Sequence, residues 1–167
     1  MNASDFGLLL VRLSLGLTLI IHGWNHWRGG GRIEGTARWF ESIGLRHGKA
    51  QAWASVVTEC AAGTGLLLGV LTPVSAAAAT GTMAVAGLTT HRRNGFFVFR
   101  EGYEYVLMIA VVAVALALIG PGRISFDHAL GTTVRGVPGG VIAAGAGVAG
   151  AALLLAVAYR PTGSDSA

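Results

Sequence analysis

Five ionisable side chains stand within or at the ends of long apolar segments of this sequence. Arg12, Glu59 and Glu104 interrupt the apolar runs themselves, and His22 and His91 stand at the ends of two runs. A charge in the hydrocarbon of a bilayer costs at least about 2.5 kcal/mol, so such side chains usually face other helices and have partners. Buried carboxylates and imidazoles can also exchange protons with a bound molecule, because burial shifts their proton affinity.

These side chains are expected to converge near one membrane surface. With a helical rise of about 1.5 Å per residue, His22, Glu59, His91 and Glu104 lie at similar depth. Arg12 comes from the other side, and its long side chain can span much of the distance to Glu59. The sequence therefore predicts one buried polar cluster of all five. Two interpretations stay open: a structural network that fixes helix packing, or a site for protons and a polar head group.

A quinone is one head group that such a cluster could bind. Aromatic rings and small residues nearby would accommodate its flat ring. The candidate pocket residues are His22, Trp24, Asn25, Glu59, His91, Asn94, Tyr103 and Glu104. Transport of a small solute and docking of another protein are further alternatives, and no catalytic residue is identified.

Two short motifs suggest other chemistry but fit it poorly. His22 and His26 have the i,i+4 spacing of metal ligands, but the glutamate of a metalloprotease motif is missing, and no metal site is predicted. The stretch GAGVAG at 145–150 matches a dinucleotide-binding pattern, but only 17 residues follow, too few for the second strand. The single cysteine, Cys60, excludes an internal disulfide and a cysteine-based metal cluster.

The elements that must position these residues are membrane helices. Apolar residues make up 53% of the 167, and charged residues only 12%, about half the usual share in soluble proteins. A span needs about 20 apolar residues, and the runs that qualify are 6–24, 53–71, 73–90, 103–119 and 140–159. Residues 36–45, TARWFESIGL, predict a short amphipathic helix in the interface, with an irregular loop as the alternative.

The expected fold class is all-α, an integral membrane helical bundle of four core transmembrane helices plus a fifth, C-terminal transmembrane helix. Residues 1–127 form the four-helix bundle, 128–139 a loop, 140–160 the additional helix and 161–167 a flexible tail.

Small residues recur every four positions on the second and fifth helices, at Gly65 and Gly69 and at Ala143, Gly147 and Ala151. Such faces let helix backbones approach closely, so we expect other membrane subunits to pack there. The lipid bilayer is the other expected partner. No dense basic run stands apart from the apolar helices, so no nucleic acid is expected.

The distribution of basic residues predicts the orientation. Nine lysines and arginines lie on one side of the expected bundle, and only Arg123 and Arg135 lie on the other. Since basic loops stay in the cytoplasm, we expect a multi-pass protein of the plasma membrane with its N-terminus outside and loops 25–52 and 91–102 cytoplasmic.

Five segments together resemble the DoxX family of small membrane proteins over residues 6–127. They are LLLVRLSLGLTLIIHGWNHW, GTARWFESIGL, TECAAGTGLLLGVLTP, THRRNGFF and GYEYVLMIAVVAVALALIGPGRISFD. The recurrent features of the family map onto Arg12, His22-Gly23, Glu59, 94–97 and 103–105. The resemblance implies a four-helix bundle and a quinone-linked role, because the family is named after a subunit of a thiosulfate:quinone oxidoreductase. The fifth segment departs from the family pattern.

The expected function is therefore that of an integral membrane subunit associated with quinone-linked redox chemistry. The alternatives are a non-catalytic accessory subunit of a larger respiratory or oxidoreductase complex and a small-solute transporter. No haem, flavin or iron–sulfur motif is recognised in the sequence, so no intrinsic cofactor is expected, and quinone is the one candidate ligand. Whether the chain is itself an enzyme stays open; if it is, it is a subunit of a quinone-dependent oxidoreductase.

Overall fold

The first helix starts with a capping box. The Asn2 side chain accepts a hydrogen bond of 3.0 Å from the Asp5 N–H, and the Asp5 carboxylate accepts one of 2.8 Å from the Asn2 N–H. These bonds satisfy donors that the first helical turn leaves free. The helix begins three residues before the apolar run expected from residue 6 and continues past the end of that run to Arg28.

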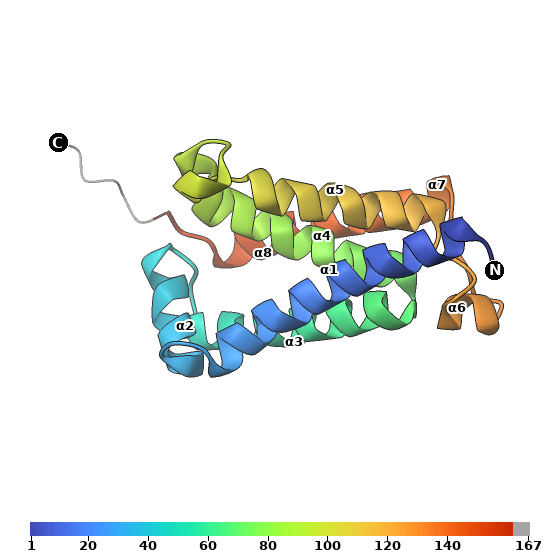
Figure 1. Ribbon diagram of the computed structural model, residues 1–167. Coiled ribbons are helices and arrows are strands. Elements are labelled where there is room, and N and C mark those ends of the chain that lie inside the picture. Colours follow the sequence, from blue (N-terminus) through green and yellow to red (C-terminus); the bar gives the residue numbers. More distant parts are fainter. Residues whose placement is uncertain (162–167) are drawn as a thin grey trace.

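The computed structural model describes residues 1–161, and helices form nearly all of its regular structure (Figure 1). In chain order they are α1 (Ala3–Arg28), α2 (Arg32–Ser42), α3 (Gly48–Leu68), α4 (Thr72–Ala86), η1 (Gly87–His91), η2 (Arg92–Asn94), η3 (Val98–Arg100), α5 (Glu104–Ile119), α6 (Phe126–Ala129), α7 (Val137–Val141), η4 (Ile142–Ala146) and α8 (Gly147–Ala158). Within the described residues there is no β-sheet, only an isolated bridge between Leu45 and Tyr159. The all-α prediction is confirmed.

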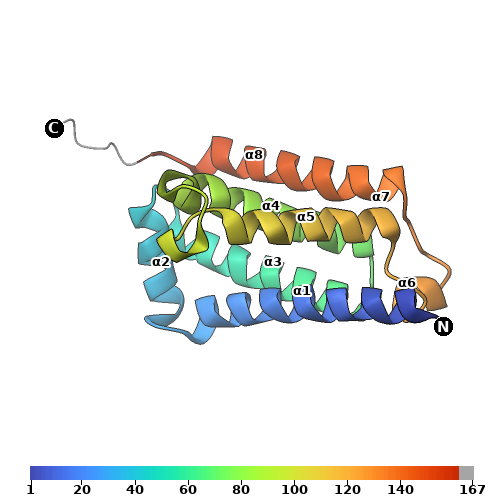
Figure 2. The same ribbon diagram turned by 45° about the horizontal axis from the view of Figure 1, so that its top comes forward.

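The long helices form an up-and-down bundle. α1 packs against α3, α3 against α4, and α4 against both α5 and α8. α8 lies on the outside of α4, away from the α1–α3 pair (Figures 1 and 2). We call one end of the bundle the α2 end; it holds α2, η1 to η3 and the C-terminal end of α8. The opposite end, called the α6 end, holds the N-terminus, the α3–α4 turn, α6 and α7 (Figure 2).

Glycines bring helix backbones into contact at two crossings. A methyl group on Gly16 of α1 would lie 2.6 Å from the Gly63 carbonyl oxygen of α3. A methyl group on Gly147 of α8 would lie 2.7 Å from the Ala77 carbonyl oxygen of α4. Both distances are far below van der Waals contact, so only glycine allows these approaches.

The small-residue faces that we expected to receive another subunit pack inside the chain instead. Ala143, Gly147 and Ala151 are buried, and Gly147 lies against α4. A side chain on Gly65 would meet Ser75, and one on Gly69 would meet Arg12. Because these residues are small, α8 can pack closely on α4, and the end of α3 can pack closely on α1 and α4. These faces are therefore covered by neighbouring helices of the same chain.

Two helices are long and apolar enough to cross a bilayer: α1 and the continuous helix Val137–Ala158, formed by α7, η4 and α8. α5 is apolar but shorter. Large apolar side chains are exposed along the outside of the bundle, among them Leu10, Leu17, Ile21, Val57, Leu107, Met108, Val111, Val148, Leu153 and Val157. This surface is typical of a protein whose solvent is lipid.

Several boundaries differ from the sequence prediction. The fifth helix begins at Val137 rather than at residue 140, because Pro138 suits a first-turn position and extends the helix backwards. A one-turn helix, α6, capped by Ser125, stands just before and at the start of the expected loop 128–139. The amphipathic helix expected at 36–45 is present as α2, with Phe40 and Ile33 buried. The predicted flexible tail lies, from residue 162 on, outside the described residues.

Candidate functional site

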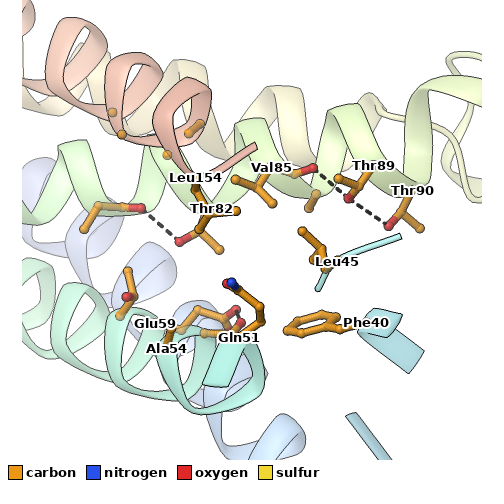
Figure 3. Close-up of a pocket in the computed structure, with 18 of the residues that line it drawn as sticks. Phe40, Leu45, Gln51, Ala54, Glu59, Thr82, Val85, Thr89, Thr90 and Leu154 are labelled. Atoms are coloured by element: carbon orange, nitrogen blue, oxygen red, sulfur yellow. Dashed lines mark hydrogen bonds between the residues drawn. The ribbon is translucent and has the colours of Figure 1, made fainter. Parts of the chain in front are cut away.

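A cavity of about 470 Å³ lies between α3, α4 and α8 and is closed at one end by α2. We call it the α4 groove, because α4 and η1 line it along most of their length. Figure 3 shows residues from each wall: Glu59 and Ala54 of α3, Thr82 of α4, and Leu154 of α8. Its size falls within the range of small-molecule pockets, about 300 to 1,000 Å³.

Glu59 is the buried charge of the groove, with only 3% of its surface exposed. Its Oε1 accepts a hydrogen bond of 2.6 Å from the Ser55 hydroxyl, which lies one helical turn earlier on α3. The Nε2 atom of His26 is 3.7 Å from the same oxygen, which is ion-pair distance if the imidazole is protonated. The other oxygen, Oε2, is buried and has no hydrogen-bond partner within residues 1–161. One carboxylate oxygen is therefore left free to accept or donate a hydrogen bond.

His26 is held in place by α2. Its ring stacks on Trp39 with centroids 6.1 Å apart and lies 5.7 Å from the ring of Phe40. The Thr36 hydroxyl donates a hydrogen bond of 3.0 Å to the His26 carbonyl oxygen, tying α2 to the end of α1. The helix α2 thus holds the imidazole next to the buried carboxylate.

The opposite rim of the groove is formed by the π-helix η1, which continues α4. The Thr89 hydroxyl bonds the Val85 carbonyl oxygen at 2.8 Å, and the Nδ1 atom of His91 lies 2.6 Å from the Glu101 carbonyl oxygen. A π-helix widens the turn and rotates the following residues, and such segments are frequent at functional sites. Here Thr89, Thr90 and His91 all line the groove.

Of the eight residues predicted for a quinone pocket, Glu59 and His91 line the groove and the other six do not. The Nδ1 atom of the exposed His22 ring lies 2.8 Å from the Thr18 carbonyl oxygen, and the ring stacks on Tyr105 of α5, which does not line the groove. Trp24 and Asn25 are exposed at the end of α1. The prediction placed these residues by depth alone, and the rotation of α1 directs His26 inward instead.

The remaining three belong to the loop between η1 and α5. Asn94 donates a hydrogen bond of 3.3 Å to the Glu101 carbonyl oxygen, and Tyr103 packs edge-on against Phe96. Glu104 accepts a hydrogen bond of 2.9 Å from the Val98 N–H. Its carboxylate therefore fixes the loop and does not reach Glu59, which corrects the predicted convergence of the two glutamates.

Arg12 also lies apart from Glu59, which corrects the prediction of a single cluster. Its guanidinium points to the α6 end and donates to the carbonyl oxygens of Ile124 at 2.6 Å, Pro121 at 3.1 Å and Leu67 at 3.4 Å. The side chain is 1% exposed. These carbonyls belong to the turns that follow α5 and to the end of α3, so Arg12 ties three chain segments together.

A second buried acid at the α6 end was missed from the sequence. Asp127 accepts hydrogen bonds from the Leu71 N–H at 2.8 Å, the Thr72 N–H at 2.8 Å and the Thr72 hydroxyl at 2.7 Å. It thereby caps the start of α4, where Leu71 has a positive φ of 45°. Asp127 stands in a short polar stretch, and no apolar periodicity marked it as buried.

The groove also contains polar residues that sequence reasoning missed, chiefly His26, Ser55 and Gln51. The i,i+4 spacing of Ser55 and Glu59 was the available signal, since it places both on one helical face. The groove offers hydrogen-bond partners and a proton-binding carboxylate to a ligand with an apolar body. Among residues 1–161, no group of three or more His, Cys, Asp or Glu residues is arranged to hold a metal ion.

The comparisons with known proteins agree with this architecture. No curated protein and no solved structure matches the chain. A family model described as DoxX matches residues 7–92, which include most of α1, all of α2 to α4, Glu59 and His91. This match and the apolar helices indicate a membrane protein of a family loosely linked to redox chemistry. Because the match covers just over half of the 167 residues, the chain belongs to the DoxX family.

Proposed function

We propose that the α4 groove binds the head group of a quinone or quinol, and that the chain is an integral membrane subunit of a quinone-linked redox system. The observation that carries the proposal is Glu59: a carboxylate lining a cavity, 3% exposed, with one oxygen lacking a partner within the described residues. An unpaired buried polar atom is costly, so a hydrogen bond from a ligand to this oxygen would be favourable.

The residues of the groove suit such a ligand. Ala54 and Ala86 leave room for a flat ring, and the aromatic ring of Phe40 offers it a face. Glu59 would hydrogen-bond a quinone oxygen through Oε2 and exchange a proton there. Ser55 fixes the carboxylate, and His26, close to Oε1 and partly open to water, would pass the proton to the α2 end.

A bound quinone would supply two-electron chemistry at this position. The sequence has no recognisable haem, flavin or iron–sulfur motif, so the electrons would come from or go to a partner subunit. The role of this chain is then to hold the head group, exclude water and manage protons.

The same proposal includes five membrane crossings, four in the core bundle and one by Val137–Ala158, in the plasma membrane. The nine basic residues counted above belong to elements of the α2 end, and Arg123 and Arg135 follow α5 at the α6 end. This asymmetry supports a cytoplasmic α2 end and an N-terminus outside. Glu59 and His26 then exchange protons with the cytoplasm.

Retention of quinone during purification tests the binding site. The wild-type chain, extracted in mild detergent, is expected to carry quinone that solvent extraction and mass spectrometry detect. Glu59→Gln should lose most of it while remaining folded. Glu34→Gln, which neutralises an exposed carboxylate of α2, is the control and should retain it. Retention of phospholipid but no quinone by the wild type would contradict the proposal.

Cysteine labelling tests the orientation. Cys60 is first replaced by alanine, since it is the one native cysteine. Arg93→Cys should then react with a membrane-impermeant maleimide only after the membrane is opened, and Arg123→Cys should react in intact cells. The reverse pattern would overturn the proposed orientation.

A further inference from the structure

The α4 groove has a polar half and an apolar half. The polar half, at the α2 end, contains Gln51, Ser55, Glu59, Thr89 and His91. The apolar half continues along α4 toward its first turn and is lined by Val74, Ala77, Ala78 and Gly81 from α4 and by Ala146 and Gly147 from the fifth helix. The head group of a ligand would contact the polar half, and a hydrocarbon chain would contact the apolar half.

The apolar half is long enough to hold part of a chain. The segment from Val74 to Thr82 extends about 12 Å at about 1.5 Å per residue. Val74 is 55% exposed and Ala146 is also exposed, so this half reaches the side of the bundle that faces lipid. A tail lying here would leave the groove into the hydrocarbon of the bilayer.

The fifth helix builds one wall of this half. The contact of Gly147 with the Ala77 carbonyl brings the helix close to α4, and Ala146 then lines the groove beside Ala78. The end of the fifth helix is fastened to the α2–α3 connection: the Arg46 N–H donates to the Ala158 carbonyl oxygen, and the Arg160 N–H to the Gly44 carbonyl oxygen, both at 2.8 Å. The wall lies outside residues 7–92, so the family match does not account for it.

We infer that the apolar half of the α4 groove holds the hydrocarbon tail of the ligand whose head group lies beside Glu59, so that the chain selects a long-tailed membrane quinone over a short, water-soluble one. This inference rests on the proposed quinone-binding function. The fifth helix is the element that confers the selectivity, because it supplies the second wall against which the tail packs.

The test compares two leucine substitutions on the fifth helix. Ala146→Leu places a larger side chain in the groove, and Ala149→Leu places the same side chain on an exposed position of the same helix that does not line it. Both alanines are exposed, so both variants are expected to fold. Ala78→Leu fills the groove from the opposite wall and should behave like Ala146→Leu.

Affinity is measured in lipid nanodiscs for a decyl-tailed benzoquinone and for the same head group without a tail. The signal is the quenching of tryptophan fluorescence, assigned with Trp39→Phe because Trp39 lines the groove. Each quinone is compared between variants, so its partition into lipid cancels. Ala146→Leu should weaken binding of the tailed quinone about tenfold or more and leave the tail-less one unchanged. Ala149→Leu should change neither.

Glu59→Gln distinguishes the proposed quinone-binding function from the inference about the tail. It should weaken the binding of both quinones, because both have the same head group. If it does so while Ala146→Leu and Ala78→Leu leave the tailed quinone unaffected, the tail inference is wrong and the proposed function stands. If Glu59→Gln leaves both affinities unchanged, the proposed function fails, and the tail inference fails with it.

Discussion

Arg12 and Glu59 are both charged, both almost fully buried and both in the interior of long helices, but their surroundings differ. Arg12 donates three hydrogen bonds to carbonyl oxygens of the α3 end and the turns after α5. Glu59 receives one hydrogen bond, from Ser55, and lines a cavity with its other oxygen unpartnered within residues 1–161. Within the part of the chain that the structure describes, each side chain has one buried atom without a partner, Arg12 Nε and Glu59 Oε2, and of these two side chains Glu59 lines the groove.

The difference indicates separate roles for the two ends of the bundle. At the α6 end, Arg12 and Asp127 connect the end of α3 and the start of α4 to the segment that follows α5, so they stabilise the fold. In the groove, the polar groups are arranged around open space, so they are suited to a ligand. Burial of a charge alone does not distinguish these roles; the number of protein partners and the neighbouring cavity do.

The largest effect is expected at Arg12. Arg12→Leu leaves the buried carbonyl oxygen of Pro121 and the partly buried one of Ile124 without this donor, and the loss should be about 3 kcal/mol or more of unfolding free energy. Thermal and denaturant unfolding in detergent would measure it. Arg46→Leu, at an exposed position, is the control and should change the stability little. An Arg12→Leu variant as stable as the wild type would remove the distinction between the two ends.

Asp127 should give the next largest effect. Asp127→Asn replaces one acceptor oxygen by a donor, and one of the N–H groups of Leu71 and Thr72 then loses its partner, at a cost of about 1 to 3 kcal/mol. Thr72→Val removes only the hydroxyl bond and should cost less. The same unfolding assay applies to both. Equal losses for the two variants would mean that the backbone caps contribute nothing.

Glu59→Gln should change stability much less than either. The substitution keeps the size of the side chain and the acceptor for Ser55, and it removes a buried charge whose desolvation opposes folding. We expect the unfolding free energy to stay within about 1 kcal/mol of the wild type. A loss as large as that of Arg12→Leu would assign Glu59 to the structural network instead of a binding site.

The exposed pair of Glu34 and Lys49 supplies a third kind of charge with the smallest effect. The hydrogen bond from Lys49, at 2.8 Å, holds the pKa of Glu34 below its ordinary value. The pair therefore adds stability at neutral pH, and this contribution disappears as the pH falls through the lowered pKa. The difference in stability between wild type and Glu34→Gln should shrink in acid and in high salt. A difference that grows in acid would contradict the pairing.

Much of the fold follows from the sequence, because lipid imposes long apolar runs and the turns are marked by Gly and Pro. The helices expected at 103–119 and 140–159 appear within a few residues as α5 and Val137–Ala158. The amphipathic helix was readable from its aromatic spacing. Carbonyl oxygens leave no such signal, since every residue has one, so the partners of Arg12 at Pro121 and Ile124 were not predictable.

The site was only partly predictable for a geometric reason. Glu59 was identified because a carboxylate in an apolar run is rare. His22 and His26 are 40° apart around α1, assuming about 100° per residue, and depth alone does not decide which one faces inward. The position of α2 decides it, by stacking Trp39 on His26. Gly147 and Ala151 of the fifth helix line the groove. In the sequence, the spacing of these small residues favoured contact with another subunit instead.

The most direct test of the central claim is the thermal unfolding of wild type and Glu59→Gln, each with and without saturating long-tailed quinone. A ligand that binds only the folded state raises the unfolding temperature. We predict equal unfolding temperatures without quinone, and a rise with quinone in the wild type alone. A Glu59→Gln variant that unfolds much earlier than the wild type, together with no response of the wild type to quinone, would show that Glu59 serves the fold and not a ligand.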